Sequence, residues 1–175
     1  MDQQFRAAIS AASHNPAALS AVADIYLRLQ SEIDARRPLC IASGRCCHFE
    51  SFGHRLFITT LELAAFLHDF NNSPARHQHR AALRDFSGQG CPFQLNKLCS
   101  VHAFRPFGCR IFFCDPTSTD WQQQRYERFH AELKSLHDTL KIPYFYLEWR
   151  HALRALFPSD SSDQPANVPS QPLWV

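Results

Sequence analysis

The sequence has no hydrophobic run long enough to cross a bilayer, and it carries almost no excess charge. A membrane-spanning helix needs about 20 apolar residues, yet the most apolar stretch, LELAAFLHDF, is interrupted by Glu62, His68 and Asp69. The formal net charge of +2 is too small to indicate electrostatic binding to nucleic acid or to a membrane surface. The N-terminal MDQQFRAAIS lacks the pattern of a secretory signal. We therefore expect a cytoplasmic protein with neither kind of partner.

The chain also lacks a glycine-rich phosphate loop and any internal repeat, which argues against a nucleotide-binding enzyme of that type and against a solenoid. Its 175 residues, 45% of them hydrophobic, are typical of one globular domain with a tail. We expect the 15 phenylalanines to fill much of the core.

Apolar residues at 3-4-3-4 spacing predict a mainly α-helical fold. The clearest helices are expected from Asn15-Pro16 to just before Pro38 and over residues 121–140. Shorter helices are expected over residues 2–14, from Thr59 to about Phe70, from Ser73-Pro74 to Phe86, and from Pro143 to Leu156, the last one including Leu147.

The predicted β-structure is small. RLFIT, residues 55–59, has the composition of a short strand, and Thr59 and Glu62 have the spacing of a capping box that opens the following helix. A hairpin is expected around Asn96-Lys97. The domain is predicted to cover residues 1–157, because residues 158–175 are rich in serine, proline and aspartate and are expected to form a flexible tail.

Cysteines are the unusual feature of the sequence. They form two clusters: Cys40, Cys46 and Cys47, then Cys91, Cys99, Cys109 and Cys114. An odd number cannot be fully paired in disulfides, and cytosolic thiols are normally reduced. All seven lie outside the long helices, mostly near glycines, which suits ligands better than core packing. We predict that all seven bind metal; the alternative is a cysteine-rich core without an ion.

Thiolate ligands favour zinc or an iron–sulfur cluster over hard cations. In an extended backbone, the adjacent Cys46 and Cys47 would point in opposite directions, so they would serve two centres, or one would bind while the other packs. His48 or His102 could complete a three-cysteine site. Nearby arginines are expected either to offset the thiolate charge or to be solvated: Arg45, Arg105 and Arg110.

Two segments together resemble a known family. CIASGRCC is similar to a C-x-x-C-x-x-C-C signature, and CPFQLNKLCSVHAFRPFGCRIFFC is similar to its downstream half. Both resemble the zinc- or iron-chelating cysteine-cluster proteins called YkgJ-like, over residues 40–114. The resemblance implies an eight-cysteine pattern with zinc or iron–sulfur as cofactor. Ser43 stands where the family has its second cysteine.

The expected fold is thus a single, mainly α domain with a small β hairpin, stapled by metal in its cysteine-rich middle. Three functions stay open: a structural metal with a possible protein partner, an iron–sulfur redox protein or enzyme with an open coordination position, and metal trafficking or sensing. No residue is singled out as catalytic. Histidines in the HQHR segment (residues 77–80), and His130 and His137, are interpreted as solvated.

Overall fold

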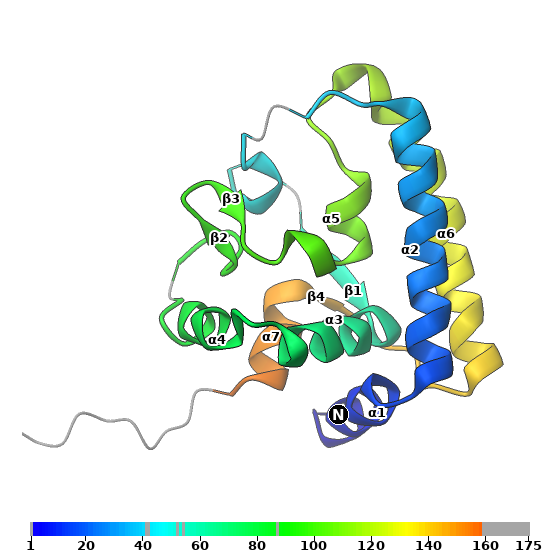
Figure 1. Ribbon diagram of the computed structural model, residues 1–175, viewed down its shortest axis with the longest axis vertical. Coiled ribbons are helices and arrows are strands. Elements are labelled where there is room, and N and C mark those ends of the chain that lie inside the picture. The colour runs from blue at the N-terminus through cyan, green and yellow to red at the C-terminus, as the bar shows by residue number, and fades with distance from the viewer. Residues whose placement is uncertain (1, 41–42, 52, 54, 87, 159–175) are drawn as a thin grey trace, which may run out of the picture.

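The computed structural model describes residues 2–40, 43–51, 53, 55–86 and 88–158, and it is mainly helical with two small antiparallel sheets (Figure 1). Its helices are α1 (Asp2–Ser13), α2 (Pro16–Arg36), α3 (Thr60–Asn72), α4 (Arg76–Arg84), α5 (Phe107–Ile111), α6 (Thr119–Leu140) and α7 (Trp149–Leu156). Its strands are β1 (Phe57–Thr59), β2 (Gln94–Leu95), β3 (Leu98–Cys99) and β4 (Tyr146–Glu148). Short 3-10 turns are η1 (Arg45–Cys47), η2 (His102–Phe104) and η3 (Pro116–Ser118).

This architecture confirms the mainly helical class with a small β element. None of the described helices is long and apolar enough to cross a membrane. The predicted flexible tail lies outside the described residues from position 159 onward.

The two long helices lie side by side and antiparallel along one edge of the molecule (Figure 1). Asn15 caps α2 as predicted, since its Oδ1 accepts hydrogen bonds from the amides of Ala17 at 3.0 Å and Ala18 at 3.3 Å. The apolar stripe of α2, which includes Leu29, is buried against a core that includes Phe129 of α6. Burial of these facing stripes confirms the two helices that the periodicity predicts.

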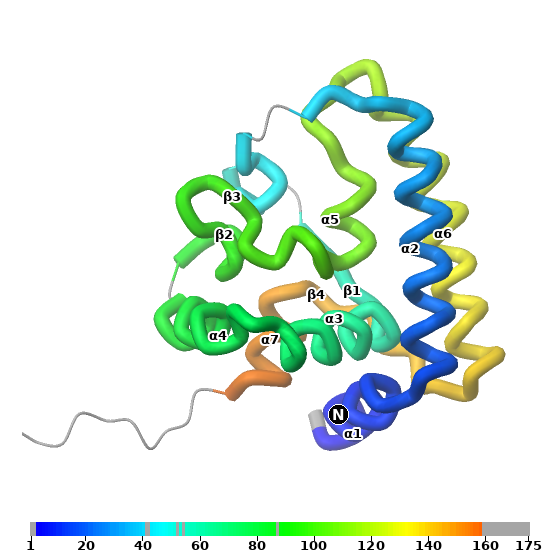
Figure 2. The backbone as a smooth tube through the Cα atoms, viewed as in Figure 1, coloured from blue at the N-terminus to red at the C-terminus, as the bar shows by residue number. Residues whose placement is uncertain are grey.

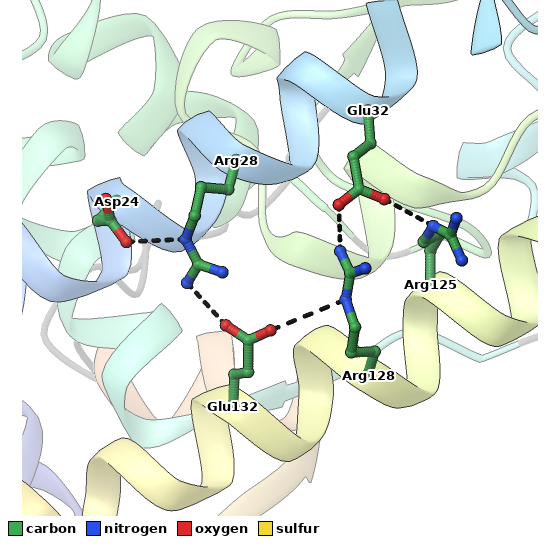
Figure 3. A network of polar contacts seen from close by, with 6 residues as sticks. All are labelled: Asp24, Arg28, Glu32, Arg125, Arg128 and Glu132. Atoms are coloured by element: carbon green, nitrogen blue, oxygen red, sulfur yellow. Dashed lines mark hydrogen bonds and ion pairs between the residues drawn. The ribbon is translucent and has the colours of Figure 1, made fainter. Parts of the chain in front are cut away.

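Ion pairs cross the exposed side of the same helix pair (Figure 3). Glu32 of α2 binds Arg125, with 2.6 Å between charged atoms, and also binds Arg128. Arg28 binds Glu132 of α6 at 2.7 Å. Because these side chains are partly exposed, we expect the ion pairs to contribute little to stability. Their main effect is to fix how the two helices are aligned along each other.

The β1–β4 sheet was not predicted, and the expected helix from Pro143 is wrong over residues 143–148, since α7 begins only at Trp149. Tyr146–Glu148 form β4, which pairs antiparallel with β1 so that Ile58 lies opposite Leu147. Glu148 then caps α7 by accepting a hydrogen bond from the amide of His151 at 3.0 Å. The strand forms because distant residues supply its hydrogen-bonding partners, which local propensity does not reveal.

The predicted hairpin is confirmed as β2–β3. Its turn residues Asn96 and Lys97 both have positive φ, 51° and 66°, as a type I′ turn requires. Lysine here occupies a position that usually favours glycine or asparagine.

Two histidines interpreted as solvated are buried. His79 lies on the buried side of α4, and its ring packs among Phe70, Phe93 and Phe104. The distance from the His79 ring centroid to each of these ring centroids is 5.8–6.0 Å. His137 is also buried, with Nδ1 3.1 Å from the Ile142 carbonyl oxygen. Both predictions are wrong because the imidazole packs as an aromatic ring, and a polar local sequence hides this.

Candidate thiol site

Six of the seven predicted cysteines line one cavity of about 220 Å³, which we call the thiol cavity. They are Cys40, Cys46, Cys47, Cys91, Cys99 and Cys109. They come from η1 and the residues before it, from the β2–β3 hairpin and the residues that precede it, and from α5. In Figure 2, η1 and the hairpin lie on the far side of α5 from the α2–α6 pair. Folding therefore brings members of both sequence clusters to the wall of one cavity.

Backbone contacts dock the first cysteine segment on the second. The amide of Cys91 donates to the carbonyl of Cys47 at 2.9 Å. Gly90 has a φ of 85°, and a Cβ at this position would lie 2.6 Å from the Cys47 carbonyl oxygen. Gln94 Nε2 donates to the Gly44 carbonyl at 2.9 Å. Glycine at position 90 is thus needed for the close approach of the two segments.

The adjacent pair does not adopt the extended backbone that we assumed for it. Cys46 and Cys47 lie in the 3-10 turn η1, where Cys46 is exposed and Cys47 is 7% exposed. A tight turn does not alternate its side chains as a strand does, so both residues line the same cavity. The premise from which we inferred two centres, or one binding sulfur and one packed sulfur, therefore does not hold, and the grouping of the two sulfurs stays a prediction.

Cys114 is the one predicted ligand that does not line the thiol cavity. It is exposed and lies in an adjoining cavity that also contacts Cys46 and Cys109. Its Sγ is 3.4 Å from Ser43 Oγ. Ser43, the residue at the position where the resemblance leads us to expect a cysteine, is therefore next to the outlying thiol.

The thiols influence one another's ionisation. Side-chain hydrogen bonding with Cys47 is the main cause that lowers the pKa of Cys46 and of Cys91, while the same contacts raise the pKa of Cys47. Burial raises the pKa of Cys99 and Cys109, and repulsion from neighbouring thiolates adds to this effect. Thiolate character is thus favoured at Cys46 and Cys91.

Some of the neighbouring arginines and histidines line the thiol cavity, and others do not. Arg105 and His102 line the thiol cavity, and Arg105 contacts the His102 ring. His48 is not among the residues that line it. Arg110 instead lies over the Tyr26 ring, with 4.3 Å from its guanidinium carbon to the ring centroid, and donates to the Arg105 carbonyl at 2.9 Å. Arg105 is therefore the arginine best placed to offset thiolate charge in this cavity.

Trp149 is a residue of the site that sequence reasoning missed. It is 1% exposed, begins α7 and lines the thiol cavity. Within the described part of the chain its indole N–H has no oxygen or nitrogen acceptor, and it contributes to lowering the pKa of Cys91 after the larger effect of Cys47. Its distance from the cysteines in sequence left no motif that would have indicated this role.

The cysteine sulfurs are suitable ligands for a soft metal, but their spacing in the structure is not that of a complete coordination shell. Among the residues that the structure describes, no three cysteine, histidine, aspartate or glutamate side chains are grouped closely enough to hold an ion. These cysteines form no disulfide: Cys40, Cys47, Cys91, Cys99, Cys109 and Cys114. Soft thiolates beside cationic and N–H donors are the chemistry that zinc and iron–sulfur clusters use.

A buried carboxyl positions the helix that carries Cys109. Glu62 is 2% exposed, and its Oε1 accepts a hydrogen bond from the amide of Phe107, the first residue of α5, at 3.1 Å. Its Oε2 accepts from the amide and the hydroxyl of Thr59 at 2.9 and 2.8 Å. The predicted capping box is confirmed, and it reaches further than expected because it joins α3 to α5.

Glu62 also predicts a pH dependence of stability. Burial raises its carboxyl pKa to about 7, from 4.5 for an unperturbed group. Between these values the folded state holds more protons than the unfolded chain, so the free energy of unfolding should fall as pH rises, by up to about 1.4 kcal/mol per pH unit. Urea unfolding at several pH values would measure this slope. Glu62→Gln should flatten it, and equal slopes in both proteins would refute the assignment.

Comparisons with protein-family models, curated proteins and solved structures find no match to this chain. The resemblance to the cysteine-cluster family therefore depends on the two sequence motifs alone and stays a prediction.

Proposed function

We propose that this chain binds a metal through cysteine thiolates, either as zinc or as an iron–sulfur cluster. The observation that carries the proposal is the convergence of six cysteines, from segments far apart in the sequence, on one cavity. Cysteines that only fill a core have no reason to share a cavity wall. Loading with metal would draw a subset of these thiolates together and add folding free energy.

The polar lining of the cavity supports the same proposal. Arg105 supplies positive charge, and Trp149 supplies a buried N–H without an oxygen or nitrogen acceptor among the described residues. This N–H already acts on Cys91, whose pKa it helps to lower, and hydrogen bonds of this kind stabilise a metal-bound thiolate. These groups would stabilise the charge that several thiolates bring to a metal.

Metal transfer is a second candidate, favoured by the exposure of the outer thiols. Cys40, Cys46 and Cys114 are exposed, whereas Cys47 is buried. An accessible thiolate can exchange its metal with a partner protein, whereas a structural site should resist chelators until the fold melts. Measuring the rate of zinc loss to a chelator below the melting temperature separates the two functions.

Elemental analysis of protein purified without oxygen tests the proposal directly. We expect at least about one equivalent of zinc or iron per chain, with visible absorption and acid-labile sulfide if the cofactor is an iron–sulfur cluster. Protein that contains neither element and does not take up either on reconstitution would contradict the proposal. Stoichiometric zinc in a colourless protein would exclude the cluster.

Restoring the missing cysteine should strengthen the site. Because Ser43 Oγ lies 3.4 Å from Cys114 Sγ, Ser43→Cys places an eighth thiol beside the outlying seventh. We expect zinc affinity to increase about tenfold or more, since a serine hydroxyl is a poor ligand for a soft metal. Competition with a chromophoric chelator under reducing conditions measures the change.

Ser135→Cys is the matched control, because it adds a thiol on the exposed side of α6. It should leave the affinity unchanged. Equal affinities for wild type and Ser43→Cys would argue that position 43 does not reach the metal.

A further inference from the structure

A second and larger cavity adjoins the thiol cavity. Its volume is about 420 Å³, within the range of about 300–1,000 Å³ typical of small-molecule sites. Cys46, Cys109 and the rings of Phe49, Phe112 and Phe113 line both cavities. A molecule in the second cavity would therefore lie directly against the thiol site without occupying it.

The wall of the second cavity is mainly aromatic and aliphatic. Phe49 and Leu56 are buried, Phe113 is half-buried, and Phe112 is 45% exposed. Gly108 adds to the wall without a side chain, and a Cβ there would lie 2.5 Å from Leu56 Cδ1. Flat apolar groups gain most from such a wall, because they pack against the phenylalanine rings.

The charge of the lining is of one sign. Arg45 and Arg55 both line the cavity and are exposed, and no described lining residue is acidic. Within the described chain Arg55 has no carboxylate partner, in contrast to Arg28, Arg125 and Arg128, which are all paired with glutamates between α2 and α6 (Figure 3). A guanidinium beside an apolar cavity favours a ligand that brings a carboxylate.

We propose that the second cavity binds a small aromatic carboxylate, with its ring system against Phe49, Phe112 and Phe113 and its carboxylate on the arginines. This inference does not depend on the metal, because Arg55 and Leu56 line the second cavity and not the thiol cavity. The aromatic part supplies most of the buried surface, and the carboxylate supplies the selectivity.

Binding of 2-naphthoate, compared with the neutral 2-naphthamide, tests the proposal. Titration of the full chain by calorimetry should show saturable binding of the acid, at least about tenfold tighter than binding of the amide. Arg55→Met keeps an unbranched, flexible side chain and removes its charge. It should weaken naphthoate binding about tenfold or more and leave naphthamide binding unchanged.

Two further variants complete the test. Phe112→Ala should weaken binding of both probes, because it removes an aromatic ring from the cavity wall. Since Phe112 is 45% exposed, the substitution should leave the fold intact. Arg154→Met, at an exposed position on α7 that does not line the cavity, should change neither. Equal affinity of the acid and the amide, or absence of saturable binding, would overturn the proposal.

Metal content measured on the same samples separates this proposal from the metal-binding one. We expect Arg55→Met to keep its metal while losing naphthoate affinity. If metal and naphthoate are lost together, Arg55 serves the thiol charge and the independent carboxylate site is refuted. If no metal is found in any sample, a selective response to naphthoate still supports the second cavity.

Discussion

Replacing Cys109 with serine should abolish stoichiometric metal binding and lower the melting temperature together. Cys109 lines both cavities and lies on α5, which is anchored to the buried Glu62. Loss of an outer-shell contact alone typically costs about 10–100-fold in metal affinity, so loss of a ligand should cost at least about 100-fold. Elemental analysis and thermal unfolding of the reconstituted variant measure the two effects.

Ala152→Ser is the control for the effect of burying a hydroxyl. Ala152 is fully buried on α7 and does not line the thiol cavity. The Ala152→Ser substitution should lower the melting temperature while the metal content stays the same. Full metal content in Cys109→Ser would remove this residue from the ligand set, and a drop in stability without metal loss would assign it to packing.

Replacing Glu62 with alanine should destabilise the fold by about 4 kcal/mol. The substitution leaves the buried amides of Thr59 and Phe107 without their acceptor, and each such loss costs about 1–3 kcal/mol. Loss of the capping box and the cavity left by the side chain add to this cost. Equilibrium urea unfolding at constant pH measures the change.

Glu127→Ala is the matched control on α6, where the carboxylate is exposed and accepts a hydrogen bond only from the neighbouring turn, from Gln123. Its stability should change by less than about 0.5 kcal/mol. If Glu62→Ala cost no more than Glu127→Ala, the connection between α3 and α5 would not contribute to stability.

The features that sequence predicted well are those fixed by neighbouring residues. The Asn15 cap, the stripe that includes Leu29, the Thr59–Glu62 box and the hairpin at Asn96-Lys97 each depend on contacts within a few positions. Their physical causes are helix periodicity, capping and turn geometry, which a single sequence displays directly.

The features that sequence missed depend on distant parts of the chain. Tyr146–Glu148 form a strand only because β1 supplies its hydrogen bonds, and Trp149 reaches the thiol cavity because that strand precedes it. Arg110 lies on Tyr26, which no local pattern indicates. The cysteine motifs predicted one set of seven ligands, whereas Cys114 lies beside Ser43 and does not line the thiol cavity.

The position of Trp149 has a consequence for synthesis on the ribosome. Every cysteine emerges before this residue does, yet the wall of their cavity is complete only after β4 has paired with β1 and α7 has docked. The thiols of the nascent chain therefore lack this wall from their own emergence until α7 has docked. Oxidation of the thiols is most favoured during this interval, so reducing conditions matter most while the polypeptide is being made.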